Sequence, residues 1–169
     1  LRMRSLAALA AVLALASGAG ARDFDRHGIS FSYPGTWHVT TKPLSNLISP
    51  TYRFAIATFL PRRTAQDDGP CLAGVARRRG ARGAYAYLLE DTTLPHRYLH
   101  RFPPRRPGLF HLPARGQMAS CDGRWSRWIP FRQAGRAFYL GISVGPRASN
   151  ATRRELRRIV AGLEIRPLR

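Results

Sequence analysis

The stretch GISFSYPGTWHVTT, residues 28–41, decides the fold class of this chain. Apolar and serine side chains alternate through residues 29–33, which is the pattern of a strand with one buried face. Pro34 and Gly35 interrupt the alternation, and residues 37–41 resume it as a second short strand. We therefore expect a β-structure whose first core-facing side chains are those of Ile29, Phe31, Tyr33 and Trp37.

Similar patterns downstream extend this β-structure. Residues 54–60 are apolar on both alternating faces, which is typical of a strand in the middle of a sheet. Residues 125–144 form the clearest hairpin, with Gln133-Ala134-Gly135 as its turn. Pro130 lies in the first arm and favours an edge strand or a bulge there, because proline cannot donate to a ladder of hydrogen bonds. Further short strands are predicted at 84–89, 117–121 and 163–166.

Two helices are predicted between these strands. The first covers residues 72–79 and ends at the glycines that follow it. The second begins after Ser149 or Asn150, and the capping-box spacing of Thr152 and Glu155 offers a competing start. Its apolar stripe consists of Leu156, Ile159, Val160 and Leu163. Residues 95–113, which are rich in proline and arginine, predict an exposed loop.

The order of these elements predicts the fold class. Many antiparallel strands with few helices indicate an α+β fold, in which an antiparallel β-sheet is flanked by helices. The length of the chain after residue 21 corresponds to one domain, residues 22–169.

Residues 1–21 have the three-part layout of a secretory signal peptide. Arg2 and Arg4 precede a uniformly apolar run at 6–16, and small residues lead to Ala21. This layout predicts cleavage after Ala21. The alternative is a retained membrane anchor, but the run is shorter than the roughly 20 residues that span a bilayer. We expect a secreted or extracytoplasmic protein of the cell envelope, with no transmembrane span after the signal.

The chain has two cysteines, Cys71 and Cys121. Both lie in the part predicted to be exported, and an even pair in an oxidising compartment indicates a disulfide. The alternative is a pair of reduced cysteines in the core.

The charge of the chain is strongly positive, with 28 Lys+Arg against 9 Asp+Glu and a formal net charge of +19. Such an excess favours an anionic partner. Arg124 and Arg127 alternate with aromatic residues, as on surfaces that bind single-stranded nucleic acid, although export argues against nucleic acid as the ligand. Arg154 and Arg158 lie opposite the apolar stripe of the last helix. These four arginines are the predicted surface for an anionic partner.

The sequence contains few groups arranged for catalysis. It lacks the glycine-flanked serine, the phosphate-binding loop and the H-E-x-x-H motif. Glu90 and Asp91 are adjacent, so on a strand they point to opposite faces. His96 and His100 have the spacing at which a helix can bind a metal, but no third ligand is evident nearby. Asp67 and Asp68 are expected to be solvated loop acids.

Two segments of the chain resemble PsbP-like domains. GISFSYPGTW resembles the G-x-x-F-x-Y-P-x-x-W pattern that opens these domains. The late segment FRQAGRAFYLGISVGPRASNATRRELRRIVAGLEI is similar to their closing hairpin, capped helix and last short strand. The resemblance is to the uncharacterised secreted branch from actinobacteria. It implies an α/β/α sandwich and a non-enzymatic accessory role, and it transfers no site residue to this chain.

Three functions are compatible with these patterns. The first is an exported, non-catalytic binding or accessory protein of the cell envelope, without a metal or other cofactor, whose partner is an anionic envelope component or an envelope protein. The second is a small secreted hydrolase that uses His96 or His100 with Glu90 or Asp91. The third is a cationic protein that disrupts membranes.

Overall fold

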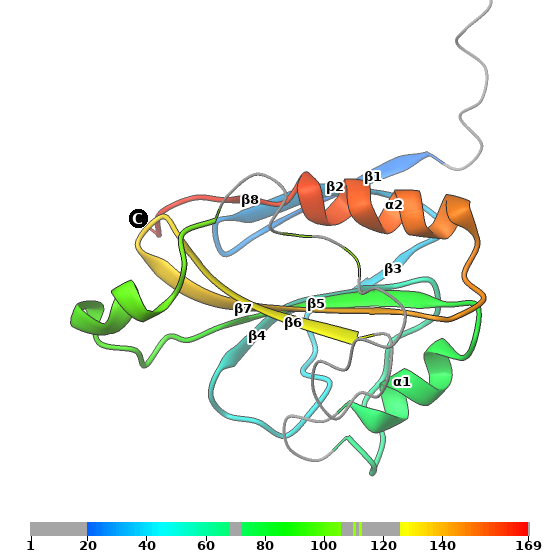
Figure 1. Cartoon of the computed structure of the whole chain (residues 1–169), viewed down its shortest axis with the longest axis horizontal. Coiled ribbons are helices and arrows are strands. Elements are labelled where there is room, and N and C mark those ends of the chain that lie inside the picture. The colour runs from blue at the N-terminus through cyan, green and yellow to red at the C-terminus, as the bar shows by residue number, and fades with distance from the viewer. Residues whose placement is uncertain (1–19, 68–71, 106–109, 111, 113–125, 169) are drawn as a thin grey trace, which may run out of the picture.

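The computed structural model describes residues 20–67, 72–105, 110, 112 and 126–168. They form two antiparallel sheets with two α-helices and one 3-10 helix. The five-stranded sheet is the middle layer, the three-stranded sheet and helix α2 lie on one of its faces, and helix α1 lies on the other (Figure 1). The predicted α+β class, with an antiparallel sheet flanked by helices, is confirmed.

The three-stranded sheet has the order β1-β2-β8, with β1 at Ala21–Arg26, β2 at Ile29–Pro34 and β8 at Glu164–Ile165. The strands β1 and β2 are joined by a two-residue turn, His27-Gly28, in which both residues have positive φ, 54° and 70°. Such a turn matches the twist of paired strands. Strand β2 confirms the prediction for residues 29–33, whereas β1 was not predicted.

The five-stranded sheet has the order β3-β4-β5-β7-β6. Its bounds are His38–Thr40 for β3, Thr51–Ala57 for β4, Ala84–Glu90 for β5, Ser126–Gln133 for β6 and Arg136–Val144 for β7. Every residue of β5 is buried, because the strand lies in the centre of the sheet and both faces are covered. The predicted hairpin is confirmed, with a turn at Ala134-Gly135, and Pro130 lies in β6 at the sheet edge.

The core has a layer on each side of the five-stranded sheet. Alternate residues of β4, β5, β6 and β7 face α2 and the three-stranded sheet, among them Ile56, Leu88 and Leu140. The other face packs against α1 through residues such as Tyr85 and Leu89. The predicted core side chains Ile29, Phe31 and Trp37 are buried, and Tyr33 is partly buried against them.

Helix α2 spans Asn150–Ala161 and begins at the predicted cap, because the side chain of Ser149 accepts a hydrogen bond from the backbone N–H of Thr152 (3.0 Å). Glu155, part of the competing capping box, instead accepts a hydrogen bond from Trp37 Nε1 at 2.9 Å. This bond joins the opening stretch to α2. The apolar stripe Leu156, Ile159 and Val160 is buried as predicted.

Helix α1 spans Ala73–Arg79, close to its predicted bounds. Its start corrects the expectation for Asp67, which is buried rather than solvated. Asp67 Oδ1 accepts hydrogen bonds from the backbone N–H groups of Gly74 (2.7 Å) and Val75 (3.1 Å). Oδ2 accepts two more from the backbone and hydroxyl of Thr64. The carboxylate therefore fixes the approach to α1.

The segment predicted as an exposed loop contains the 3-10 helix η1, His96–Arg101. Leu99 and Phe102 are buried because they pack against Ala137 and Tyr139 of β7. No helix among the described residues is both long and apolar enough to cross a membrane. The predicted strand 117–121, both cysteines, Asp68 and all but the last two residues of the predicted signal lie outside the described residues.

Candidate anion-binding surface

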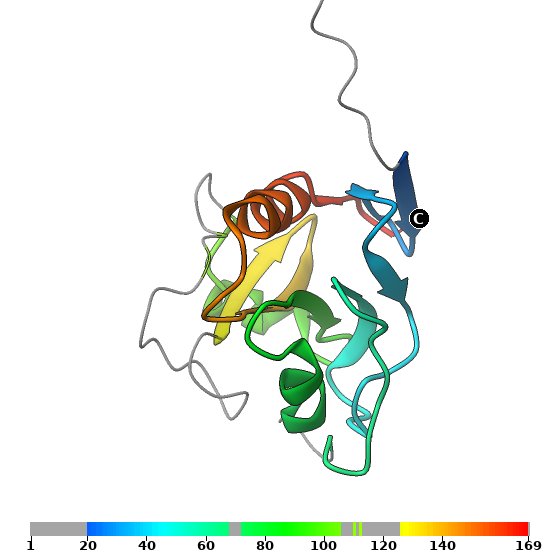
Figure 2. The ribbon, with the colours of Figure 1, turned by 90° about the vertical axis from the view of Figure 1, so that its right-hand side faces the viewer.

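Two loops lie side by side at the end of the molecule that faces the viewer in Figure 2. One follows α1 at residues 80–83, and the other joins β7 to α2 at residues 145–149. Gly145 N donates to Gly83 O (2.8 Å), and Arg147 N donates to Ala81 O (2.7 Å). A Cβ atom on Gly145 would lie 2.2 Å from Ala81 O, so only glycine permits this approach.

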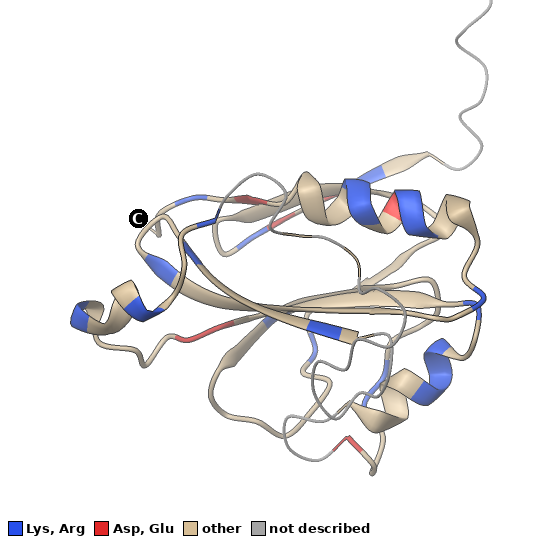
Figure 3. Cartoon of the chain, in the orientation of Figure 1, with Lys and Arg blue, Asp and Glu red and all other residues tan. Residues whose placement is uncertain are grey.

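Five exposed arginines gather around these loops, and we call them the arginine edge: Arg77, Arg78, Arg82, Arg147 and Arg154. Arg77 and Arg78 come from the last turn of α1, Arg82 and Arg147 from the paired loops, and Arg154 from α2. Figure 3 shows these elements and their basic positions at one end of the structure. Arg157 and Arg158, also exposed, continue the charge along the outside of α2.

Two further arginines hold the backbone of this end in place. Arg79 Nη1 donates to Ser143 Oγ (2.7 Å) and to the carbonyl oxygen of Val144 (3.1 Å), which ties α1 to β7. Arg153 Nη2 donates to the carbonyl oxygen of Gly145 (3.1 Å), and its Nε donates to that of Ala148 (3.3 Å). The exposed arginines therefore project from a backbone that is already ordered.

The elements that build the arginine edge contain a single carboxylate, Glu155 of α2. Residues 72–89 and 137–154 contain neither aspartate nor glutamate. Glu155 accepts from Trp37, and elsewhere in the described residues Asp67 caps α1 and Asp25 is paired with Arg166. The positive charge of the edge therefore exceeds the negative charge of its own elements.

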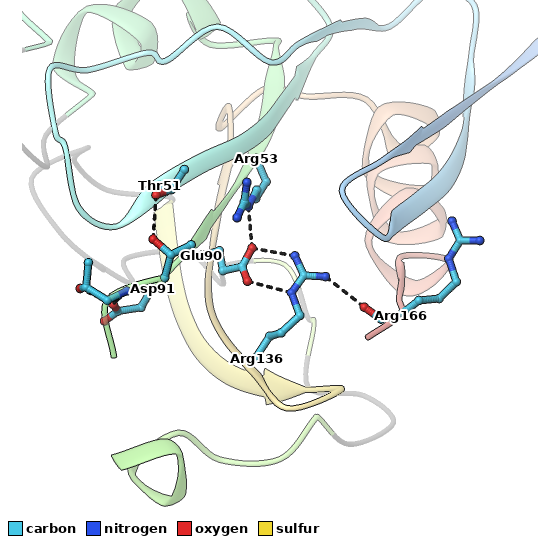
Figure 4. A network of polar contacts seen from close by, with 8 residues as sticks. Thr51, Arg53, Glu90, Asp91, Arg136 and Arg166 are labelled. Atoms are coloured by element: carbon cyan, nitrogen blue, oxygen red, sulfur yellow. Dashed lines mark hydrogen bonds and ion pairs between the residues drawn. The ribbon is translucent and has the colours of Figure 1, made fainter. Parts of the chain in front are cut away.

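Glu90 is held in a buried network on the side of the sheet that faces β2 and β8 (Figure 4). Arg136 donates to both of its carboxylate oxygens, at 2.7 and 2.6 Å, and Arg53 Nε donates to Oε2 at 2.5 Å. Arg136 Nη1 also donates to the carbonyl oxygen of Arg166 (3.1 Å). Burial raises the pKa of Glu90, but hydrogen bonds and charges from Arg136 and Arg53 outweigh it and lower the pKa overall.

This network bears on the predicted catalytic role of Glu90. Both carboxylate oxygens of Glu90 are occupied by guanidinium groups, which suits a structural ion pair rather than an acid or base. His96 and His100 are exposed on η1, and both line a pocket to which neither Glu90 nor Asp91 contributes. The structure thus brings the two histidines together without the acid. The described residues contain no group of three metal-ligating side chains.

The predicted arginine surface is only partly located. Arg154 and Arg158 are exposed on α2, Arg127 is half-buried on β6, and Arg124 lies outside the described residues. Burial lowers the pKa of Arg127. Sequence reasoning missed the arginines of α1 and of the paired loops. The available signal was the glycines around them, because two glycine-bearing loops can approach closely.

Comparisons with protein-family models, with curated proteins and with solved structures found no match for this chain. Function is therefore argued from geometry and charge.

Proposed function

We propose that this chain is an exported, non-catalytic binding or accessory protein of the cell envelope that binds an anionic partner. The observation that carries the proposal is the arginine edge, where five exposed arginines come from elements whose single acid, Glu155, is engaged by Trp37. The layout of residues 1–21 supports export. The resemblance of both ends of the domain to PsbP-like proteins supports an accessory role.

The shape of the arginine edge favours an extended partner. Its side chains come from α1, two loops and α2, so a ligand that contacts all of them must span several elements. Arginine binds phosphate and carboxylate groups through two parallel hydrogen bonds. Because the supporting loops are already joined by backbone hydrogen bonds, binding requires little ordering of the main chain. A polyanion or an anionic lipid surface fits these requirements.

Sedimentation with lipid vesicles tests this proposal. The protein is expected to bind vesicles that contain phosphatidylglycerol, and not neutral phosphatidylcholine vesicles. Binding should weaken markedly between about 50 and 300 mM NaCl, because salt screens exposed charges. Soluble polyphosphate, as a second probe, should compete with the vesicles.

Two variants that lose the same number of positive charges distinguish binding through the arginine edge from binding through net charge alone. In R78Q/R82Q/R147Q we expect vesicle affinity to fall by about a hundredfold, since each of the three lost contacts contributes roughly 1 kcal/mol near an anionic surface. The control R26Q/R62Q/R101Q removes the same charge from exposed arginines elsewhere. Equal losses in both variants would contradict the proposal, as would equal binding of neutral vesicles.

A further inference from the structure

A second basic site lies between η1 and the turn of the β6–β7 hairpin. It is a pocket of about 520 Å³, and Figure 1 shows η1 and this turn at the end of the molecule away from the arginine edge. The charged and titratable side chains that line it are His96, Arg97, His100 and Arg132. The volume falls within the range of small-molecule sites.

The lining contains no acid. Besides the four basic side chains, it consists of Gln133 and small or apolar residues. The nearest acids along the chain are already engaged, because Asp91 Oδ1 accepts from the backbone and hydroxyl of Thr93, and Glu90 accepts from two arginines. Arg97 and Arg101 both stack on the ring of Tyr98, with their guanidinium carbons 4.9 and 4.4 Å from its centroid. Of the other cations nearby, Arg105 donates to Gln133 and to the carbonyl oxygens of Ala161 and Leu163, and Arg136 donates to Glu90. The lining is therefore positively charged through Arg97 and Arg132.

The orientation of His100 leaves one ring nitrogen for a ligand. Its Nδ1 lies 2.7 Å from the carbonyl oxygen of Arg97. A carbonyl oxygen only accepts, so Nδ1 carries the hydrogen of this bond. The other ring nitrogen, Nε2, is then an acceptor in the neutral ring and becomes a donor when the imidazole is protonated. Protonation thus turns His100 into a donor for an anion.

The two walls of the pocket are joined by backbone hydrogen bonds. Arg132 N donates to Pro103 O (2.8 Å), and Arg105 N donates to Arg132 O (3.1 Å). These bonds hold the segment after η1 against β6, and they fix the position from which the Arg132 side chain starts. The basic groups of η1 and β6 therefore face one space without a large conformational change.

We propose that this pocket binds a small phosphorylated molecule, with Arg132, Arg97 and the two histidines around its phosphoryl group. Two arginines match the oxygens of a phosphate by bidentate hydrogen bonds. A phosphomonoester carries between one and two negative charges near neutral pH, and the two arginines supply the opposite charge. The site lies apart from the arginine edge, so its occupancy is independent of the partner proposed above.

Inorganic phosphate and a simple phosphomonoester, glycerol phosphate, are the probes for this site. Their dissociation constants are measured on the intact protein by nuclear magnetic resonance, through the imidazole signals of His96 and His100. At a fixed pH we expect phosphate to shift the signals of both imidazoles, because both rings line the pocket. Acetate and citrate serve as carboxylate probes, and we expect weaker binding of both.

Three variants distinguish phosphate binding in the pocket from nonspecific attraction by the positive charge of the protein. R132Q should weaken phosphate binding by about tenfold, the size of one charge-assisted contact. H96Q/H100Q, followed through backbone amide signals of the hairpin turn, should bind phosphate about tenfold more weakly than wild type at the same pH. R82Q removes a charge from the arginine edge and should leave the dissociation constant within about twofold. The proposal is overturned if R82Q and R132Q weaken binding equally, if H96Q/H100Q binds phosphate as tightly as wild type, or if carboxylates bind as tightly as phosphate.

Discussion

Glu90 is a buried acid that joins several strands of a protein with few acidic residues. The residue is 4% exposed and receives hydrogen bonds from Arg136 and Arg53, which themselves come from different strands, β7 and β4. The group therefore links three neighbouring strands of the five-stranded sheet. Its lowered pKa means that the folded state favours the charged form.

The stability of the protein should depend on pH through Glu90. Because its pKa is lower in the folded state, its contribution is complete above the unfolded pKa of about 4.5 and is lost as the pH falls through the folded value. E90Q should destabilise the protein by about 3 kcal/mol at neutral pH, since two arginines lose their partner. Urea unfolding between about pH 3 and pH 7 measures both effects.

The matched control is D25N, which breaks the exposed pair with Arg166. It should cost less than about 1 kcal/mol, as exposed ion pairs do. The difference in unfolding free energy between wild type and E90Q should shrink below about pH 4. A difference that stays constant down to the lowest pH would contradict this account.

At the scale of elements, the sequence predicted those strands and helices whose apolar residues recur with a regular period. Alternation identified β2, β5 and the β6–β7 hairpin, and the apolar stripe with Ser149 identified α2. Strand β1 was missed because ARDFDR has only one buried residue, Phe24, and the strand depends on pairing with β2. The arginine edge was missed for a related reason, since it arises from contact between loops about 60 residues apart.

Gly145 is the position where this contact between elements can be tested. G145A should lower the free energy of unfolding by about 2 kcal/mol, because the new Cβ meets backbone atoms of residues 81 and 82 that cannot move alone. Separation of the loops should also weaken vesicle binding. Chemical denaturation and vesicle sedimentation measure the two effects. The control P146A changes an exposed neighbour in the same loop and should have little effect on the free energy of unfolding or on vesicle binding. Equal effects of G145A and P146A would contradict the role given to the close approach of the loops.

At the scale of the whole molecule, a net charge of +19 works against the compact state. The described acids mostly serve internal contacts, so repulsion among exposed arginines is relieved mainly by ions from solution. The arginine edge concentrates this repulsion at one end of the structure. A surface prepared for an anionic partner therefore has a cost in stability when the partner is absent.

Added salt should stabilise the folded state. Between about 20 and 300 mM NaCl we expect a gain of roughly 1 kcal/mol, as screening reduces the repulsion. R78Q/R82Q/R147Q should be more stable than wild type at low salt and should respond less to salt. Thermal unfolding of both proteins across this range provides the measurement. A salt response of the same size in the two proteins would show that the repulsion lies elsewhere.

The close approach of the two loops at Gly145 also limits which residues of this fold can be substituted during evolution. Exposed arginines can be exchanged one at a time, because their side chains are not packed in the core. Gly83 and Gly145 have no such freedom, since a side chain at either would strike the backbone of the α1 end. Relatives that have lost the basic surface should therefore retain these two glycines, so the pair would mark shared descent where the charges no longer do.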